Sequence, residues 1–171
     1  MPSIQLDGGF DPVERLFAQL KAFARHPKKL MEELAYQGEA STRRRFETET
    51  DPDGDKWQKS LRAELFGGKT LTKDGHLADS ISSDATDEVA VWGSNRIYAA
   101  IHQFGGAIHA KTSKGLAFTL ADGLNVVVDT VVMPQRAFLG LSNEDREDML
   151  DITEKFIDDL LAEARGVQGG A

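Results

Sequence analysis

A chain of 171 residues is long enough to bury a core as a single domain, so folding requires neither disulfides nor a structural metal. Its formal charge of -8 disfavours a general nucleic-acid binder, because affinity for phosphate backbones comes mainly from clustered Lys and Arg, and the lack of cysteine excludes disulfides and thiolate chemistry. The N-terminus lacks a signal-peptide pattern and no run of about 18 apolar residues occurs, so we expect cytoplasmic synthesis and no membrane span.

The first part of the chain is predicted to be mainly helical. Residues 1–10 alternate in polarity and predict a short edge strand. Asp11 followed by Pro12 predicts a helix start, because proline is favoured at the first helical position, and apolar residues then recur at helical spacing as far as Pro27. A second helix is predicted over about residues 28–47. Its apolar residues are Leu30, Met31, Leu34, Ala35 and Phe46.

A polar segment separates these helices from the predicted strands. The stretch TETDPDGDKW, residues 48–57, predicts a turn after which Trp57 packs back onto the helices. Residues 58–76 are polar, contain glycine and lack periodicity, so we predict a mobile loop there. From Leu77 onward, DSISS and EVAVWGS predict a hairpin across the turn DATD, with Ile81, Val89 and Val91 on alternating positions.

A second hairpin is predicted in GLAFTLADGLNVVVDTVV, residues 115–132. A three-residue loop over residues 121–123 places Gly123 in the left-handed conformation that such loops need. A two-residue Asp-Gly loop would instead set polar residues opposite leucines, so we favour the longer loop. The longer loop creates one wholly apolar face by pairing Leu116 with Val128, Phe118 with Val126, and Leu120 with Leu124.

The chain is predicted to end in a helix after residue 142. Pro134 ends the preceding strand, and the apolar residues around Phe138 are expected to anchor the helix or to contact a partner. Ser142 can cap the helix together with Asp145, in a variant of the capping box. The apolar stripe of this helix comprises Met149, Ile152, Phe156, Ile157 and Leu160.

The order helix, helix, antiparallel strands, helix predicts an α+β fold. We expect two N-terminal helices and a C-terminal helix packed on a small antiparallel β-sheet built from hairpins. No internal repeat or strong boundary divides the chain, so residues 1–165 are expected to form a single domain. The glycine-containing end, residues 166–171, is expected to be a disordered tail.

The stretch NRIYAAIHQFGG, residues 95–106, predicts a short helix that Ser94 or Asn95 caps and Gly105 ends. His102 falls beside Tyr98 on the flank of the helix, at a boundary or exposed position. The helix is expected to bury one face, formed by Ile97, Ala100, Ile101 and Phe104.

Enzyme-like and metal-like motifs are weak. A metal site would need a third ligand besides His102 and His109, and no carboxylate or histidine stands at matching spacing. A general-base role for His102 needs a nucleophile, and no G-x-S-x-G motif is present. GGKT at residues 67–70 lacks the first glycine of a phosphate-binding loop, since Ala63 stands there. The triplet RRR at residues 43–45 predicts a solvated helix face or, as an alternative, a contact with an acidic partner.

Four segments together resemble the phage virion morphogenesis (tail-completion) family of Mu-like phages and prophages. They are STRRRFETETDPDGDKW, LTKDGHLADSI, YAAIHQFGG and PQRAFLGLSNEDREDML, in the order and with the spacing of that family. The resemblance covers most of residues 28–160. The segment SLRAELFGGKTLTKDG departs from it, because family members tend to carry a longer or differently composed basic loop there.

The resemblance implies a structural protein, not an enzyme, that acts late in virion assembly at the head-proximal end of the tail, in tail completion and head–tail joining. It implies a homo-oligomeric ring in the virion, formed from a subunit that is monomeric in solution, in the host cytoplasm. The partners it implies are the tail tube or tail terminator and the head–tail connector proteins, with no cofactor, metal, membrane or sequence-specific nucleic acid. The alternatives are a head-side adaptor or minor capsid component and, last, a hydrolase using His102.

Residues 58–76 or the loop near 107–114 are expected to order on assembly. We expect Trp57, Phe104 and Phe138 to act mainly through packing, because buried aromatic residues usually contribute core area. Arg136 is expected to hold the neighbouring apolar residues through a carboxylate pair. The family-motif or assembly candidates are Trp57, Tyr98, His102, Phe104, Gly105, Arg136 and Phe138.

Overall fold

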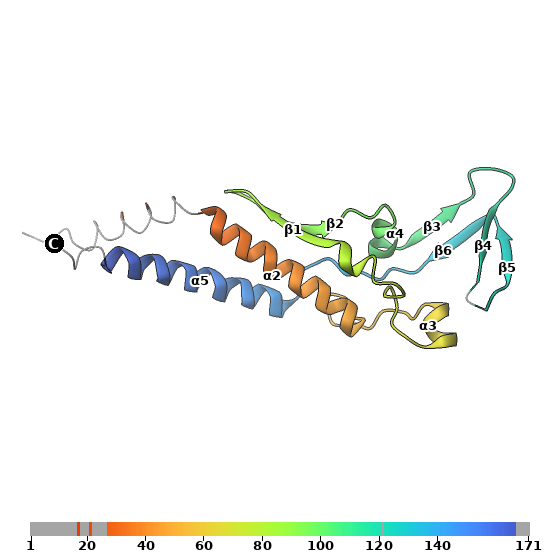
Figure 1. Ribbon diagram of the computed structural model, residues 1–171, viewed down its shortest axis with the longest axis horizontal. Helices are drawn as coiled ribbons and strands as arrows, with labels where there is room; N and C mark the ends of the chain where they lie inside the picture. Colours follow the sequence, from red (N-terminus) through yellow and green to blue (C-terminus); the bar gives the residue numbers. More distant parts are fainter. Residues whose placement is uncertain (1–16, 18–20, 22–26, 121, 167–171) are drawn as a thin grey trace, which may run out of the picture.

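The computed structural model describes residues 17, 21, 27–120 and 122–166, and their elements are arranged along one long axis (Figure 1). The edge strand over residues 1–10, nearly all of the first helix and the tail over residues 167–171 lie outside the described residues. Gly166, which we assigned to the tail, is the last residue of the C-terminal helix. Helices and antiparallel strands are both present, as the α+β prediction requires.

Two long helices form one half of the molecule. Helix α2 spans Pro27–Thr48 and helix α5 spans Asn143–Gly166, and they lie side by side (Figure 1). They run antiparallel, since Leu30 near the start of α2 packs with Phe156 and Leu160 of α5. Both helices were predicted. Ile157 was wrongly placed on the buried stripe, because its side chain is 42% exposed.

The first β-hairpin covers α2. Strand β1 spans Ile81–Ala85 and strand β2 spans Ala90–Ser94, after the short 3-10 helix η1, Ala78–Ser80. Ile81 is buried, but Val91 lies on the opposite, exposed face because it pairs with Asp84. On the inner face, Trp92 lies so close to α2 that a Cβ at Gly38 would come within 2.4 Å of its ring.

The second hairpin has the predicted register. Strand β4, Leu116–Thr119, pairs with β5, Asn125–Val128, so that Leu116 lies opposite Val128 and Phe118 opposite Val126. The amide of Leu120 donates to the carbonyl of Leu124 at 2.8 Å, and Gly123 has φ of 91°. The three-residue turn is therefore confirmed.

This hairpin is the outer part of a longer arm, residues 106–133. At its base, strand β3, Gly106–His109, pairs with β6, Thr130–Met133. The amide of Ala110 donates to the carbonyl of Asp129 and continues the ladder, and residues 111–115 then leave it before β4 begins. The strands of the described residues form three separate two-stranded sheets, so the single small sheet that we predicted is wrong.

The main core lies where α2, β1 and the chain before α5 meet. Phe46 of α2 contacts Trp57 edge-on at a centroid distance of 5.4 Å and Phe138 at 5.2 Å. Trp57 therefore packs back onto the helices, as predicted. The buried members of this core are Phe46, Trp57, Leu77, Ile81, Ala99 and Phe138.

The segment over residues 58–76 is not wholly a loop. Residues Leu61–Phe66 form helix α3, which Ser60 caps by accepting a hydrogen bond from the amide of Ala63 at 3.3 Å. The helix has only six residues, too few for a helical apolar period to be visible in the sequence. GGKT follows this helix directly, whereas a phosphate-binding loop precedes its helix, which agrees with its rejection.

Candidate functional site

The motif YAAIHQFGG forms helix α4, Ala99–Phe104, and leads into β3. The predicted buried face is wrong, because Ile97 is 98% exposed and Phe104 is 73% exposed, while Ala99 is buried. The helix begins only at Ala99, so Ile97 is not part of its helical face. We therefore also correct the expectation that Phe104 acts through packing within the subunit.

The hydrogen bonds of Gln103 explain which side of α4 faces the core. Its side-chain carbonyl accepts hydrogen bonds from the amides of Phe138 and Leu139, both at 2.9 Å. Its side-chain amide donates to the carbonyl of Leu139, also at 2.9 Å, so one glutamine satisfies three backbone groups of a segment that has no strand partner there. Gln103 was missed, since side-chain-to-backbone bonds leave no periodic pattern in the sequence.

Two of the four family segments, YAAIHQFGG and PQRAFLGLSNEDREDML, therefore contact each other, because α4 binds the backbone of residues 134–139. The amide of Arg136 donates to the carbonyl of His102 at 2.7 Å. Gly105 ends α4 with φ of 67°, as predicted for its C-cap. A Cβ at this position would come within 2.8 Å of the backbone nitrogen of Gln135, so this approach requires glycine.

Arg136 holds a neighbouring loop. Its side chain is buried, and Nε donates to the carbonyl of Gln58 at 2.7 Å while Nη2 donates to that of Lys59 at 3.3 Å. The expected carboxylate pair is therefore wrong, and the guanidinium binds backbone carbonyls instead. Burial lowers the pKa of Arg136, against a smaller opposing effect of Glu64. The Trp57 indole adds a bond from Nε1 to the carbonyl of Ala137 at 2.9 Å.

His102 and Tyr98 line a cavity of about 300 Å³ together with Arg62, Lys73 and His76. Their rings meet edge-on at 6.2 Å, and His102 Nδ1 is buried with no hydrogen-bond partner in the structure. Burial, and secondly the charge of Arg136, lowers the pKa of His102, which favours a neutral imidazole. A general base of the triad type needs an orienting partner on its ring, and Nδ1 has none.

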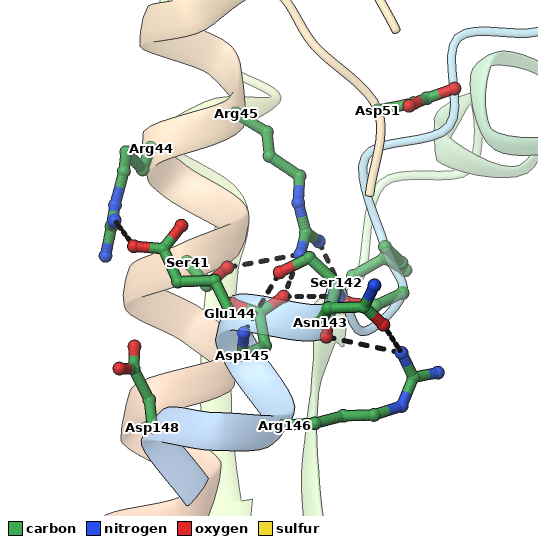
Figure 2. Close-up of polar contacts among 12 residues, drawn as sticks. Ser41, Arg44, Arg45, Asp51, Ser142, Asn143, Glu144, Asp145, Arg146 and Asp148 are labelled. Carbon is green, nitrogen blue, oxygen red and sulfur yellow. Dashed lines mark hydrogen bonds and ion pairs between the residues drawn. The ribbon is translucent and has the colours of Figure 1, made fainter. Parts of the chain in front are cut away.

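The arginine triplet is a solvated face only in part, because Arg43 and Arg44 are exposed as predicted and Arg45 is not. Arg45 is buried, and its Nη1 donates to the carbonyls of Phe138 and Gly140, both at 2.9 Å. Its Nη2 binds Ser41 and the carboxylate of Asp145, which joins α2 to the start of α5 (Figure 2). Arg44 pairs with Glu144 at 3.3 Å on the surface. The burial of Arg45 in particular was not predicted, because its partners lie far away in the chain.

The arm carries several apolar residues that the core does not use. None of its described residues, 106–120 and 122–133, is buried. The arm extends away from α2 and α5, and the β4–β5 hairpin lies at the opposite end of the molecule from the end of α5 (Figure 1). The apolar face of the hairpin comprises Leu116, Phe118, Leu120, Leu124, Val126 and Val128.

Neither a metal centre nor a membrane span is found in the described part of the chain. Within those residues no group of three or more His, Asp or Glu side chains could hold a metal ion. None of the helices described there is long and apolar enough to cross a bilayer.

Comparisons with known proteins agree with the sequence resemblance. The model of the phage virion morphogenesis family matches residues 9–158. The chain is 42% identical over 76 residues to "Putative capsid assembly protein G" of Escherichia phage Mu, a match that covers 39% of this chain and 49% of the Mu protein. It is 32% identical over 132 residues to "Mu-like prophage FluMu G protein 2" of Haemophilus influenzae, covering 77% of this chain and 79% of that protein. No solved structure matches the chain.

Proposed function

The chain belongs to the phage virion morphogenesis family, and we propose that it acts as a structural protein at the head-proximal end of the tail, in tail completion and head–tail joining. The observation that carries this proposal is the arm over residues 106–133, whose apolar side chains contribute nothing to the buried core. Exposed apolar surface of this kind is typical of protein–protein contact sites. In an assembly role, another subunit or virion protein covers that surface.

In this role the subunits form a ring around the path of the DNA. Its neighbours are the tail tube or tail terminator on one side and the head–tail connector on the other. Head-to-tail contacts that close produce such rings. The net charge of -8 suits a channel wall, because like charge keeps the passing DNA from binding. Assembly takes place in the host cytoplasm, and the protein remains in the virion.

The ring restricts assembly to the tail end if residues 58–76 or residues 107–114 become ordered on assembly. Helix α3 lies in the first segment, and the second begins within β3 and contains Lys111 and Lys114. We expect at least one of the two segments to gain protection from hydrogen exchange in the assembled state. Unchanged protection in both segments between the free and assembled protein contradicts this step.

A head-side role is the second candidate. It is favoured by the printed name of the phage Mu relative, which refers to capsid assembly. In that role the same apolar surfaces contact the portal or a capsid protein, and the protein is a head-side adaptor or a minor capsid component. Catalysis has no part in either role. The hydrolase alternative ranks last, because His102 Nδ1 has no orienting partner.

Electron microscopy of phage lysates tests the proposal. A stop codon placed early in this gene of the parent phage or prophage is compared with the same mutant carrying a plasmid copy. Tail completion predicts filled heads and separate tails in the mutant, and joined particles when the plasmid copy is present. Empty or misshapen heads with normal tails favour the head-side role. Joined, infectious particles in the mutant contradict both roles.

A further inference from the structure

The β4–β5 hairpin leaves its apolar face open to solvent. It is a two-stranded sheet, and an isolated hairpin of this kind is marginally stable in water. Its apolar face is open, with Leu124 at 59% exposure and Phe118 at 40%. The described part of the subunit does not bury this face, so its natural cover is another molecule.

The hairpin carries positive charge beside this face. Lys111 and Lys114, the two lysines of the arm, are both exposed on the corner over residues 111–115. Gly115 fixes the corner with φ of 73°, at a point where a Cβ would come within 2.7 Å of the Val127 side chain. The arm also has two exposed acids: the Asp122 carboxylate accepts a bond from the amide of Leu124 at 3.0 Å in the turn, and Asp129 lies opposite Ala110, next to the corner. The arm therefore presents an apolar face next to a basic corner.

Helix α5 presents the complementary combination on its outer side. Four of its exposed acids are spaced so that they form an acidic ridge opposite the buried Phe156, while the exposed cations Arg146 and Lys155 lie off this ridge. Beside the ridge, Leu150 is 62% exposed and Ile157 is 42% exposed. These two residues are seven positions apart, so they lie on the same side of the helix. The acidic ridge consists of Glu147, Asp151, Glu154 and Asp158.

We propose that the arm of one copy docks on the outer side of α5 of the next copy, with Lys111 and Lys114 against the acidic ridge and the hairpin face over Leu150 and Ile157. The arm and α5 extend in opposite directions from the middle of the molecule (Figure 1), so one subunit does not satisfy this contact by itself. A contact between two different surfaces of identical subunits is heterologous and propagates head to tail. The inference rests on the proposed ring and names the surfaces that join its subunits.

Disulfide trapping tests this contact, because the chain contains no cysteine. The full-length variants Leu124→Cys and Leu150→Cys are purified separately, mixed at the highest soluble concentration and oxidised. The expected result is a mixed disulfide between arm and α5 that exceeds both homodimers. Leu124→Cys mixed with Val91→Cys is the matched control, since Val91 is a similarly exposed apolar residue on β2. Equal trapping in the control mixture, no mixed disulfide, or a dominant homodimer of the Leu124→Cys variant overturns the proposal.

Charge reversal checks the orientation of the contact. Adding Lys111→Glu and Lys114→Glu to the Leu124→Cys variant should lower the yield of the mixed disulfide by about fivefold. High salt should also lower the yield for the pair without charge reversal. Adding Asp151→Lys and Glu154→Lys to the α5 variant should restore the yield for the reversed arm. A reversed arm that cross-links as well as the original contradicts the proposed charge pairing.

The cross-link and the phage experiment can fail separately. If the mixed disulfide is absent but the stop mutant still accumulates separate heads and tails, the assembly role remains and this subunit contact is wrong. If the mixed disulfide forms but the mutant makes joined particles, the contact remains and the role in joining is wrong.

Discussion

Arg45 and Asp145, one hundred positions apart in the chain, form a buried ion pair between α2 and the first turn of α5. The carboxylate also accepts a bond from the amide of Ser142 at 2.7 Å (Figure 2). The guanidinium binds the carbonyls of Phe138 and Gly140. The same residues thus cap the helix, join the two long helices and fix the segment that enters α5.

Breaking this pair should strongly destabilise the fold. We expect Arg45→Ala to lower the free energy of unfolding by about 3–5 kcal/mol, because the variant leaves Asp145 buried without its cation. Arg44→Ala is the matched control, since Arg44 pairs with Glu144 on the surface, and it should cost less than about 1 kcal/mol. Urea unfolding of both variants checks the difference. Similar losses for the two variants contradict the structural role of the buried pair.

Asp145 should also contribute to acid sensitivity. Burial raises the pKa of its carboxyl, but hydrogen bonds from Ser41 and Ser142 and the charge of Arg45 outweigh this effect and leave the pKa below its ordinary value. A lowered pKa in the folded state stabilises the protein above the unfolded-state value of about 3.9, and this contribution is lost as the pH falls through the folded-state pKa.

The Asp145→Asn variant isolates this contribution. Its deficit in unfolding free energy relative to the parent should be largest near pH 7 and should shrink as the pH falls below about 4. Urea unfolding at a series of pH values measures the deficit. Asp148→Asn is a suitable control, because that half-buried carboxylate accepts a bond from Gln37 at 2.6 Å and forms no ion pair among the described residues. A deficit for Asp145→Asn that stays constant with pH counts against the lowered pKa.

Local chemistry predicted much of the fold from sequence. Apolar residues at helical spacing predicted α2 and α5, and the Ser142–Asp145 capping box was confirmed by reciprocal bonds of 2.7 and 3.0 Å. The β4–β5 register was predicted residue by residue from two requirements. Gly123 had to take a left-handed conformation, and apolar residues had to lie opposite one another. Such features depend on neighbours in the chain or directly across a turn.

The errors concern interactions between distant segments. Periodicity placed Phe104 inside, but the three hydrogen bonds of Gln103 to residues 138 and 139 decide which side of α4 faces the core. Arg45 looked like one member of a solvated triplet, and its burial depends on carbonyls and a carboxylate more than 90 residues away. Of the candidate site residues, the structure brings together those of α4 and residues 134–139, while Phe104 points outward.

Gly38 should not tolerate a side chain. In a helix interior, replacing glycine by alanine normally stabilises by up to about 1 kcal/mol. Here the added Cβ would come within 2.4 Å of the Trp92 ring, so we expect Gly38→Ala to destabilise by about 1–3 kcal/mol. Thermal or urea unfolding gives the sign of the change. The double variant Gly38→Ala with Trp92→Leu should recover part of the loss, and independent effects of the two substitutions would contradict the close approach.

Variants of Phe104 and Phe138, two of the three phenylalanines in the four family segments, should distinguish an effect on folding from an effect on assembly. Phe138 is fully buried, so Phe138→Ala should lower the free energy of unfolding by about 3–5 kcal/mol. Phe104 is 73% exposed, and Phe104→Ala should change stability by less than about 0.5 kcal/mol. If the exposed ring contacts a partner in the virion, the Phe104 variant should nevertheless fail to complement the stop mutant. Unfolding measurements combined with plaque counts give both quantities for the same pair of variants. Full complementation by Phe104→Ala would exclude this ring from the assembly contact, and a stable, inactive Phe138→Ala would contradict its packing role.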